Sequence, residues 1–269
     1  MIAIQRCARH AFAVAILGLS LGLSGCYTIH TASVFGHDSL KFPTQDFESA
    51  KPEMDAGIVV KALSTPNLSA GRFDLAVQGG IVNSVLFPVS SGLSLSLGMG
   101  ASGYYAENSR SFYNTTGEQR VVTFMGYGFT GQLKPTCFLG MGKRRFTFGG
   151  DFVYDKEFGD YLAYRNTLPS IATIHSTVAN YELDFSPYGQ TFSGSFTAGY
   201  ASKVGSKSAI AIELAAGLCY PDFLYDAYSF EAFSATVSYT CPYFWGWASV
   251  ELLSYSDFGI GLGLGFRIP

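Results

Sequence analysis

Residues 258–268 read Phe-Gly-Ile-Gly-Leu-Gly-Leu-Gly-Phe-Arg-Ile. Large apolar side chains alternate with glycine at nearly every step, and successive side chains of a β-strand point to opposite faces. One face of this segment is therefore apolar, while the other carries almost no side chain. A period of two predicts a strand between two different environments, because the apolar residues of an amphipathic helix recur every three to four positions instead.

The same alternation recurs along most of the chain. In 92–104, Leu93, Leu95 and Leu97 alternate with serine and glycine. Clear alternation also occupies 72–83, 145–155, 191–202 and 209–220, and weaker versions occupy 57–63, 120–133, 136–142, 177–185, 232–242 and 244–253. Several of these segments approach the roughly 9–11 residues with which a tilted strand crosses a bilayer. We expect ten to twelve antiparallel strands.

The composition excludes several classes of protein. Only 14% of the 269 residues are charged, whereas soluble domains carry about 25%. The 48% hydrophobic content is too high for a disordered chain, and the net charge of −3 offers no basic excess for nucleic acid. The aromatic content is 16%, and there are 31 glycines. The chain is therefore rich in dispersed apolar residues and poor in charge.

The low charge also decides which face of the sheet points outward. Opposite the apolar face lie glycine, serine, alanine and threonine, and a water-exposed wall of that kind would be poorly soluble. In an outer-membrane barrel the apolar face contacts lipid and the lumen takes small and polar side chains. Closure also pairs every strand edge, which hydrocarbon requires. The fold class is therefore expected to be all-β, a closed up-and-down antiparallel transmembrane β-barrel of ten to twelve strands.

Aromatic residues near the expected strand ends fit the girdles of such a barrel at the two membrane interfaces. These residues are Tyr104, Tyr105, Tyr154, Tyr220, Phe223, Tyr243, Phe244, Trp245 and Trp247.

The N-terminus carries a processing signal. Two arginines precede the apolar stretch 11–23, which is too short to span a bilayer. The motif Leu23-Ser24-Gly25-Cys26 resembles the lipobox of bacterial lipoproteins, and a secretory signal that happens to contain a cysteine is the alternative. The resemblance implies a signal peptide over 1–25 and a covalent lipid on Cys26, with no other cofactor. Tyr27 stands where the inner-membrane retention signal has Asp, which favours a lipid-anchored protein of a Gram-negative-type outer membrane.

Two further segments complete the expected organisation. Residues 26–56 lack alternation and are expected to form a lipidated tether or a plug, and residues 57–269 form the barrel domain. The run 259–268 resembles the last strand of outer-membrane barrels, which the insertion machinery reads, although Pro269 replaces the usual terminal aromatic residue. Membrane lipid and this machinery are the expected partners.

Motifs for catalysis are weak. Two G-x-G-x-x-G runs, at 98–103 and 126–131, lie inside alternating segments, whereas a dinucleotide site needs such a loop to open a helix. His175 near Ser176 and Asp184 is the nearest approach to a hydrolase set, and no motif supports it. We expect no catalytic residue, no bound metal and no enzymatic activity.

Ionisable residues on the small-residue face are the candidate lumen charges. They are Arg72, Asp74, Arg145, Asp151, Asp155, Glu213, Glu251 and Arg267. Charges inside a membrane face a wet or paired interior and mark functional sites by default. A structural network of ion pairs is the alternative, and we favour it. Because five of the eight are acids, a conducting lumen is expected to prefer cations mildly.

The expected function is non-enzymatic: a narrow, porin-like pore, or a transport or structural component. Glycine and serine on the inner face predict an interior that is open, holds an apolar ligand or small solute, or is plugged by the N-terminal segment. Two alternatives stay open. One is a soluble lipoprotein barrel that binds a hydrophobic ligand with its apolar face inward, and the other is a lipid-modifying enzyme of the membrane.

Overall fold

The computed structural model describes twelve stretches of the chain. They are residues 28–30, 52–67, 72–90, 92–108, 122–140, 143–160, 162–163, 182–184, 189–205, 208–220, 230–253 and 257–268. The proposed lipidation site Cys26 and its signal peptide lie outside them, as do His175 and Ser176. In the described part, no helix is long and apolar enough to span a bilayer.

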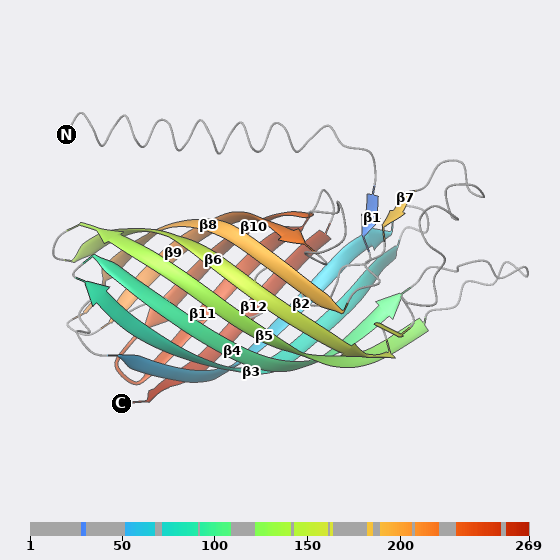
Figure 1. The fold of residues 1–269 in the computed structure, drawn as a ribbon, viewed down its shortest axis with the longest axis horizontal. Helices are drawn as coiled ribbons and strands as arrows, with labels where there is room; N and C mark the ends of the chain where they lie inside the picture. Colours follow the sequence, from blue (N-terminus) through green and yellow to red (C-terminus); the bar gives the residue numbers. More distant parts are fainter. Residues whose placement is uncertain are drawn as a thin grey trace, which may run out of the picture.

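Ten strands form a closed barrel (Figure 1). They are β2 (Glu53–Asn67), β3 (Arg72–Ser90), β4 (Leu93–Asn108), β5 (Val122–Leu139), β6 (Arg144–Gly159), β8 (Gln190–Lys203), β9 (Ala209–Tyr220), β10 (Phe230–Thr240), β11 (Phe244–Leu253) and β12 (Asp257–Ile268). Each strand pairs antiparallel with its neighbours in chain order, and β12 pairs with β2 to close the sheet. The short strands β1 (Thr28–His30) and β7 (Glu182–Asp184) pair in parallel outside the barrel. The expectation of a closed, up-and-down, all-β barrel is confirmed, with ten strands.

Two expected strands are absent from the barrel for identifiable reasons. Segments 120–133 and 136–142 were expected as separate strands, but the single strand β5 runs through both. Pro135 interrupts the pairing of β5 with β6, which resumes at Thr136, because proline has no N–H for the ladder. Of segment 177–185 the structure describes Glu182–Asp184, which form β7 and pair with β1 outside the barrel. The barrel also begins earlier in the chain than expected. Its first strand, β2, starts at Glu53, four residues before the expected start at residue 57.

The barrel has two different ends. Short turns join β3 to β4, β5 to β6, β8 to β9 and β10 to β11, and β2 begins and β12 ends at the same end. We call this the turn end; Figure 1 marks the C-terminus there. The strand ends that are joined by the longer connections, 109–121, 160–189 and 221–229, lie at the opposite end of the barrel, which we call the loop end. Outer-membrane barrels show the same asymmetry, with short periplasmic turns and long extracellular loops.

The outer face of the barrel carries the large apolar side chains. On β12, Leu264 is 63% exposed and Phe266 is 72% exposed, whereas the alternate glycines face inward. The outward side chains of the other strands follow the same pattern, as Met99 on β4 and Phe196 on β8 show. The expectation of an inward apolar face, on which the soluble ligand-binding alternative depends, is therefore wrong, because the apolar face points away from the interior.

Candidate functional site

The inner wall of the barrel is mostly polar, and its described side chains are largely buried. Hydroxyl side chains line β8 and β10: Thr191, Ser193, Ser195, Thr197, Ser234, Thr236, Ser238 and Thr240, each at most 7% exposed. Lumen-facing charged residues are equally enclosed, with Lys61 and Glu251 at 2% and Asp155 at 1%. Solvent therefore reaches little of the inner wall, and any conduit through it is narrow.

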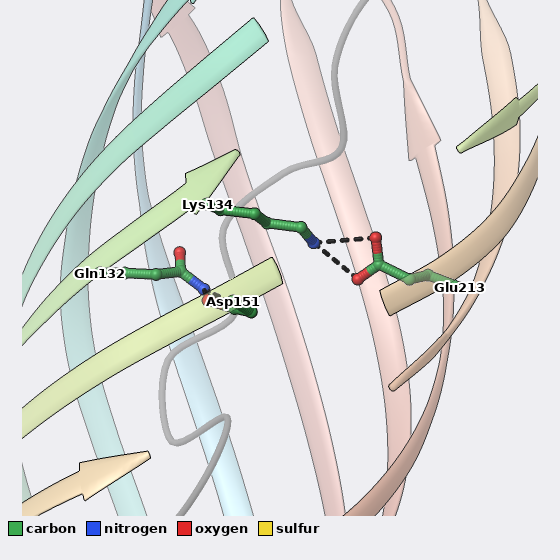
Figure 2. Close-up of polar contacts among 4 residues, drawn as sticks. All are labelled: Gln132, Lys134, Asp151 and Glu213. Carbon is green, nitrogen blue, oxygen red and sulfur yellow. Dashed lines mark hydrogen bonds and ion pairs between the residues drawn. The ribbon is translucent and has the colours of Figure 1, made fainter. Parts of the chain in front are cut away.

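An ion pair crosses the lumen near the turn end. Nζ of Lys134, from β5, lies 2.6 Å from Oε1 and 2.8 Å from Oε2 of Glu213, from β9 (Figure 2). Strands β6 and β8 separate β5 from β9 in the barrel wall, so the two side chains meet by reaching into the interior. Both are largely buried, at 13% and 11% exposure, which keeps the pair poorly screened by salt.

A second polar contact lies beside this ion pair in Figure 2. Gln132 on β5 donates through Nε2 to both carboxylate oxygens of Asp151 on β6, at 2.7 and 2.8 Å. The carboxylate is thus held in one orientation. The amide Oε1 of Gln132 is buried and accepts no hydrogen bond from any described residue. A polar oxygen therefore remains available to water or an ion inside the lumen.

A second ion pair uses the glycines of β12. Nζ of Lys61 on β2 lies 2.5 Å from Oε2 of Glu251 on β11. These strands flank β12, whose residues opposite Lys61 and Glu251 are Gly261 and Gly259. Because neither glycine has a side chain, the lysine and glutamate can meet above the strand between them. The glycine face of 258–268 thereby makes room for a charged contact.

Arg267 joins the last strand to the first. Its Nε lies 3.1 Å from Oδ1 of Asp55, the residue paired with it across the β12–β2 seam. Its Nη1 also lies 3.3 Å from Oε2 of Glu53. All three side chains are mostly buried, so these contacts fasten the seam at which the barrel closes.

Toward the loop end, carboxylates of β6 accept hydrogen bonds from neutral groups. The hydroxyl of Tyr104 donates to Oε1 of Glu157 at 2.6 Å, and the hydroxyl of Thr130 donates to Asp155. Hydrogen bonds to a charged acceptor are about twice as strong as neutral ones. The inner wall of β6 is therefore acidic over Asp151, Asp155 and Glu157, with neutral donors facing each carboxylate.

The two tryptophans correct the predicted girdle. Trp245 and Trp247 point into the lumen, are 1% and 7% exposed, and pack with Val59 and Val82. They face inward because the glycines of β12 and β2 leave space that the indoles fill; a Cβ on Gly265 would lie 2.3 Å from the ring of Trp245. Their aromatic surface packs inside the barrel and does not reach the outer face.

Other members of the predicted girdle divide by position. Tyr104 also faces the lumen, at 5% exposure, whereas Tyr154 and Phe244 lie on the outer face and Tyr243 is exposed in a turn. Tyr105 follows the outward alternation of β4. The side chain of Tyr220 and all of Phe223 fall outside the described residues.

Six of the eight candidate lumen charges have described side chains, and all six face the interior: Arg145, Asp151, Asp155, Glu213, Glu251 and Arg267. Arg145 lies over the ring of Phe138, 5.8 Å from its centroid. Arg72 and Asp74 lie at the loop end of β3, and their side chains fall outside the described part. The structure does not gather the six at one point; it distributes them among separate contacts.

Sequence reasoning missed the basic partners. Lys61 and Lys134 face the lumen and hold Glu251 and Glu213, yet neither was a candidate. Four further residues face the lumen and were not candidates either: Glu53, Asp55, Gln132 and Glu157. Lys61 was hidden because the inward residue Val59 is apolar and blurs the alternation. Lys134 was hidden because Pro135 divided its strand in two.

The described side chains provide no group of three or more His, Cys, Asp or Glu placed to hold a metal ion. The inner wall can instead form ion pairs, exchange hydrogen bonds with water, and present fixed charge to a passing solute.

No protein-family model and no curated protein matches the sequence. Solved structures with a similar shape include the β domain of the Bordetella autotransporter BrkA, with a TM-score of 0.45 and 9% identity over 80% of this chain and 100% of that one. The translocator domain of the autotransporter NalP from Neisseria meningitidis gives 0.41 and 10%, over 80% and 87%. The Pseudomonas putida toluene transporter TodX gives 0.32 and 11%, over 81% and 68%.

Proposed function

We propose that the chain is a lipid-anchored β-barrel of a Gram-negative-type outer membrane and forms a narrow, non-enzymatic pore. The observation that carries the proposal is the sorting of side chains across one sheet. Large apolar residues are exposed on the outside, and hydroxyls and paired charges are buried inside. Water would be a poor solvent for that outer wall, whereas lipid suits it.

The length of β6 supports the proposal that the barrel crosses a membrane. Its outward cations, Arg144 and Lys156, stand at the two ends of an apolar row that includes Phe146, Phe152 and Tyr154. At about 3.4 Å per residue and a tilt of about 40°, the steps between the two cations cover roughly 30 Å along the barrel axis. This matches the hydrocarbon thickness of about 30 Å. Each cation would therefore reach one membrane interface.

Lipid anchoring is the part of the proposal that depends on the N-terminal sequence. Leu23-Ser24-Gly25-Cys26 supports acylation of Cys26. The last strand, β12, supports delivery by the outer-membrane insertion machinery, because it combines the apolar alternation that such strands show with the pairing that closes the barrel. The barrel supplies the membrane insertion, and the lipid adds a second attachment.

The pore is the function that the interior favours. An inner wall of hydroxyls, Lys134–Glu213 and Lys61–Glu251 offers polar partners along its length, while the low exposure of that wall limits passage to water and small ions. A transport role for larger solutes would need the cross-lumen pair to open.

Membrane insertion is tested with a Cys26→Ala variant, which removes the acylation site. We expect it to stay in the membrane fraction after an alkaline carbonate wash, as the unchanged chain does, because the barrel itself contacts lipid. Release of the variant as a soluble monomer would refute the membrane barrel.

Conductance in planar bilayers tests the pore. We expect small channels from the unchanged protein and larger ones from the Lys134→Ala/Glu213→Ala variant, because both side chains that cross the lumen are then shortened. Lys156→Ala, on the outer face, is the matched control and should not change the conductance. Silence of both the unchanged protein and the double variant would leave a structural barrel in place of a pore.

A further inference from the structure

Two exposed cations stand at the turn end of the outer wall. Lys143 lies in the turn before β6, and Arg144 is the first residue of β6. The backbone N–H of Lys203, at the end of β8, donates to the carbonyl of Lys143 at 2.9 Å, so the β5–β6 and β8–β9 turns lie against each other. The β5–β6 turn that carries both cations is therefore fastened to the neighbouring end of β8.

No acid of the described outer wall offsets these charges. Every Asp or Glu of a barrel strand whose side chain is described faces the lumen, where Glu213 is paired with Lys134. Among the described residues, none forms an ion pair with Lys143 or Arg144. In a chain whose net charge is −3, this corner is locally basic and open to an anion.

An apolar surface lies next to the two cations. The side chain of Arg144 is on the same outward face as Phe146, whose ring packs against Tyr200 on β8 with centroids 5.3 Å apart. Phe146 is 52% exposed. Ser202 on β8 is the pairing partner of Arg144, so a residue with a hydroxyl group lies directly beside the arginine in the sheet. Cation, hydroxyl and exposed aromatic surface thus follow one another from the turn into the lipid-facing wall.

We propose that Lys143 and Arg144 bind the phosphate of an anionic phospholipid headgroup in the leaflet at the turn end, with its acyl chains against Phe146 and Tyr200. This inference rests on the proposed membrane position of the barrel. A guanidinium matches a phosphate through two parallel hydrogen bonds, and a neighbouring ammonium adds a point charge. Basic groups near a membrane surface favour anionic lipids in the same way.

Native mass spectrometry of the purified protein tests the site. The protein in micelles is offered phosphatidylglycerol and phosphatidylcholine with identical acyl chains. We expect retention of phosphatidylglycerol to exceed that of phosphatidylcholine, and Lys143→Ser/Arg144→Ser to reduce the preference at least roughly fivefold. Lys156→Ser, which removes the outward cation at the other end of β6, is the matched control and should keep the preference.

Unchanged preference in the double variant would refute the site. If inorganic phosphate displaces phosphatidylglycerol from the unchanged protein, the two cations bind free phosphate instead of a lipid headgroup. Should the double variant not fold, Lys143→Ser alone must lower the preference, because this side chain lies in a turn and packs no strand. Flotation of the same samples with phosphatidylcholine vesicles separates the two proposals: a chain that does not float refutes the membrane barrel, and a chain that floats without lipid preference refutes only the headgroup site.

Discussion

The contact between Lys61 and Glu251 is a buried ion pair with both side chains 2% exposed. We predict that Lys61→Met lowers the free energy of unfolding by about 3–5 kcal/mol, because the carboxylate of Glu251 then keeps its burial and loses its ammonium. Urea titration of the barrel in lipid vesicles measures the change. The chain's two tryptophans, Trp245 and Trp247, report it by fluorescence, since both are buried in the lumen.

A second variant separates the effect of losing the ion pair from the effect of losing the lysine side chain. Lys61→Met/Glu251→Gln should recover most of the stability, because neither of these two positions then buries a charge. Lys156→Met, on the outer face, is the control and should change the free energy of unfolding little. If the double variant is no more stable than Lys61→Met, the isolated carboxylate is not the cause.

Single residues show where sequence reasoning about the site succeeded and failed. Alternation placed Asp151 and Glu251 on the small-residue face, and the structure has both inside. It could not find Lys134, because the pairing of the strand through Pro135 depends on β4, which continues past the proline on the other side. It also could not tell which charges meet, since Lys134 and Glu213 lie three strands apart around the barrel and no sequence spacing encodes that distance.

At the scale of the strand, the glycines of β12 act as space for neighbouring side chains. A Cβ on Gly265 would lie 2.3 Å from the carbonyl oxygen of Ala56 and 2.3 Å from the ring of Trp245. We predict that Gly265→Ala lowers the free energy of unfolding by about 1–3 kcal/mol, because backbone and indole must both shift. The same urea titration measures the loss.

Gly131 provides the matched control for that variant. It also lies within a strand, β5, but on the outer face, and a Cβ there would have nothing within 4 Å. Gly131→Ala should therefore be neutral or slightly stabilising, since alanine loses less conformational freedom on folding. Equal losses in Gly131→Ala and Gly265→Ala would point to a general effect of glycine in strands, not to the tryptophan contact.

The strands also show how far periodicity reaches. It predicted β12 and β4 closely, because each has one strictly apolar face. It placed Trp245 and Trp247 at an interface, because aromatic residues near a strand end usually belong there. The structure turns both inward, since the inward glycines of β12 and β2 leave volume that only a large side chain fills. The direction in which the two tryptophans point thus depends on the residues of the neighbouring strand. The pattern of one segment alone does not contain that information.

At the scale of the whole molecule, the lumen is asymmetric along its axis. Described lumen-facing acids are Glu53, Asp55, Asp151, Asp155, Glu157, Glu213 and Glu251, and the bases are Lys61, Lys134, Arg145, Lys203 and Arg267. Four of these bases, all except Lys61, lie in the half of the barrel nearer the turn end. The inward acids of β6 continue toward the loop end instead, where Tyr104 and Thr130 donate to them. Among the described lumen side chains, those nearer the loop end are therefore mainly acidic.

We predict from this arrangement that the reconstituted protein, as the proposed pore, prefers cations. The reversal potential in a potassium chloride gradient should give a potassium-to-chloride permeability ratio above unity, because carboxylates in a narrow lumen raise the local cation concentration. Asp155→Asn/Glu157→Gln keeps the shape of both side chains and one acceptor oxygen on each, for Thr130 and Tyr104, while removing their charge. It should lower the ratio by roughly twofold or more. Lys156→Gln changes a charge of the same strand on the lipid side and should leave the ratio unchanged. Anion selectivity in the unchanged protein would contradict the prediction outright. An unaltered permeability ratio in the double variant would show that lumen charges other than Asp155 and Glu157 cause the selectivity.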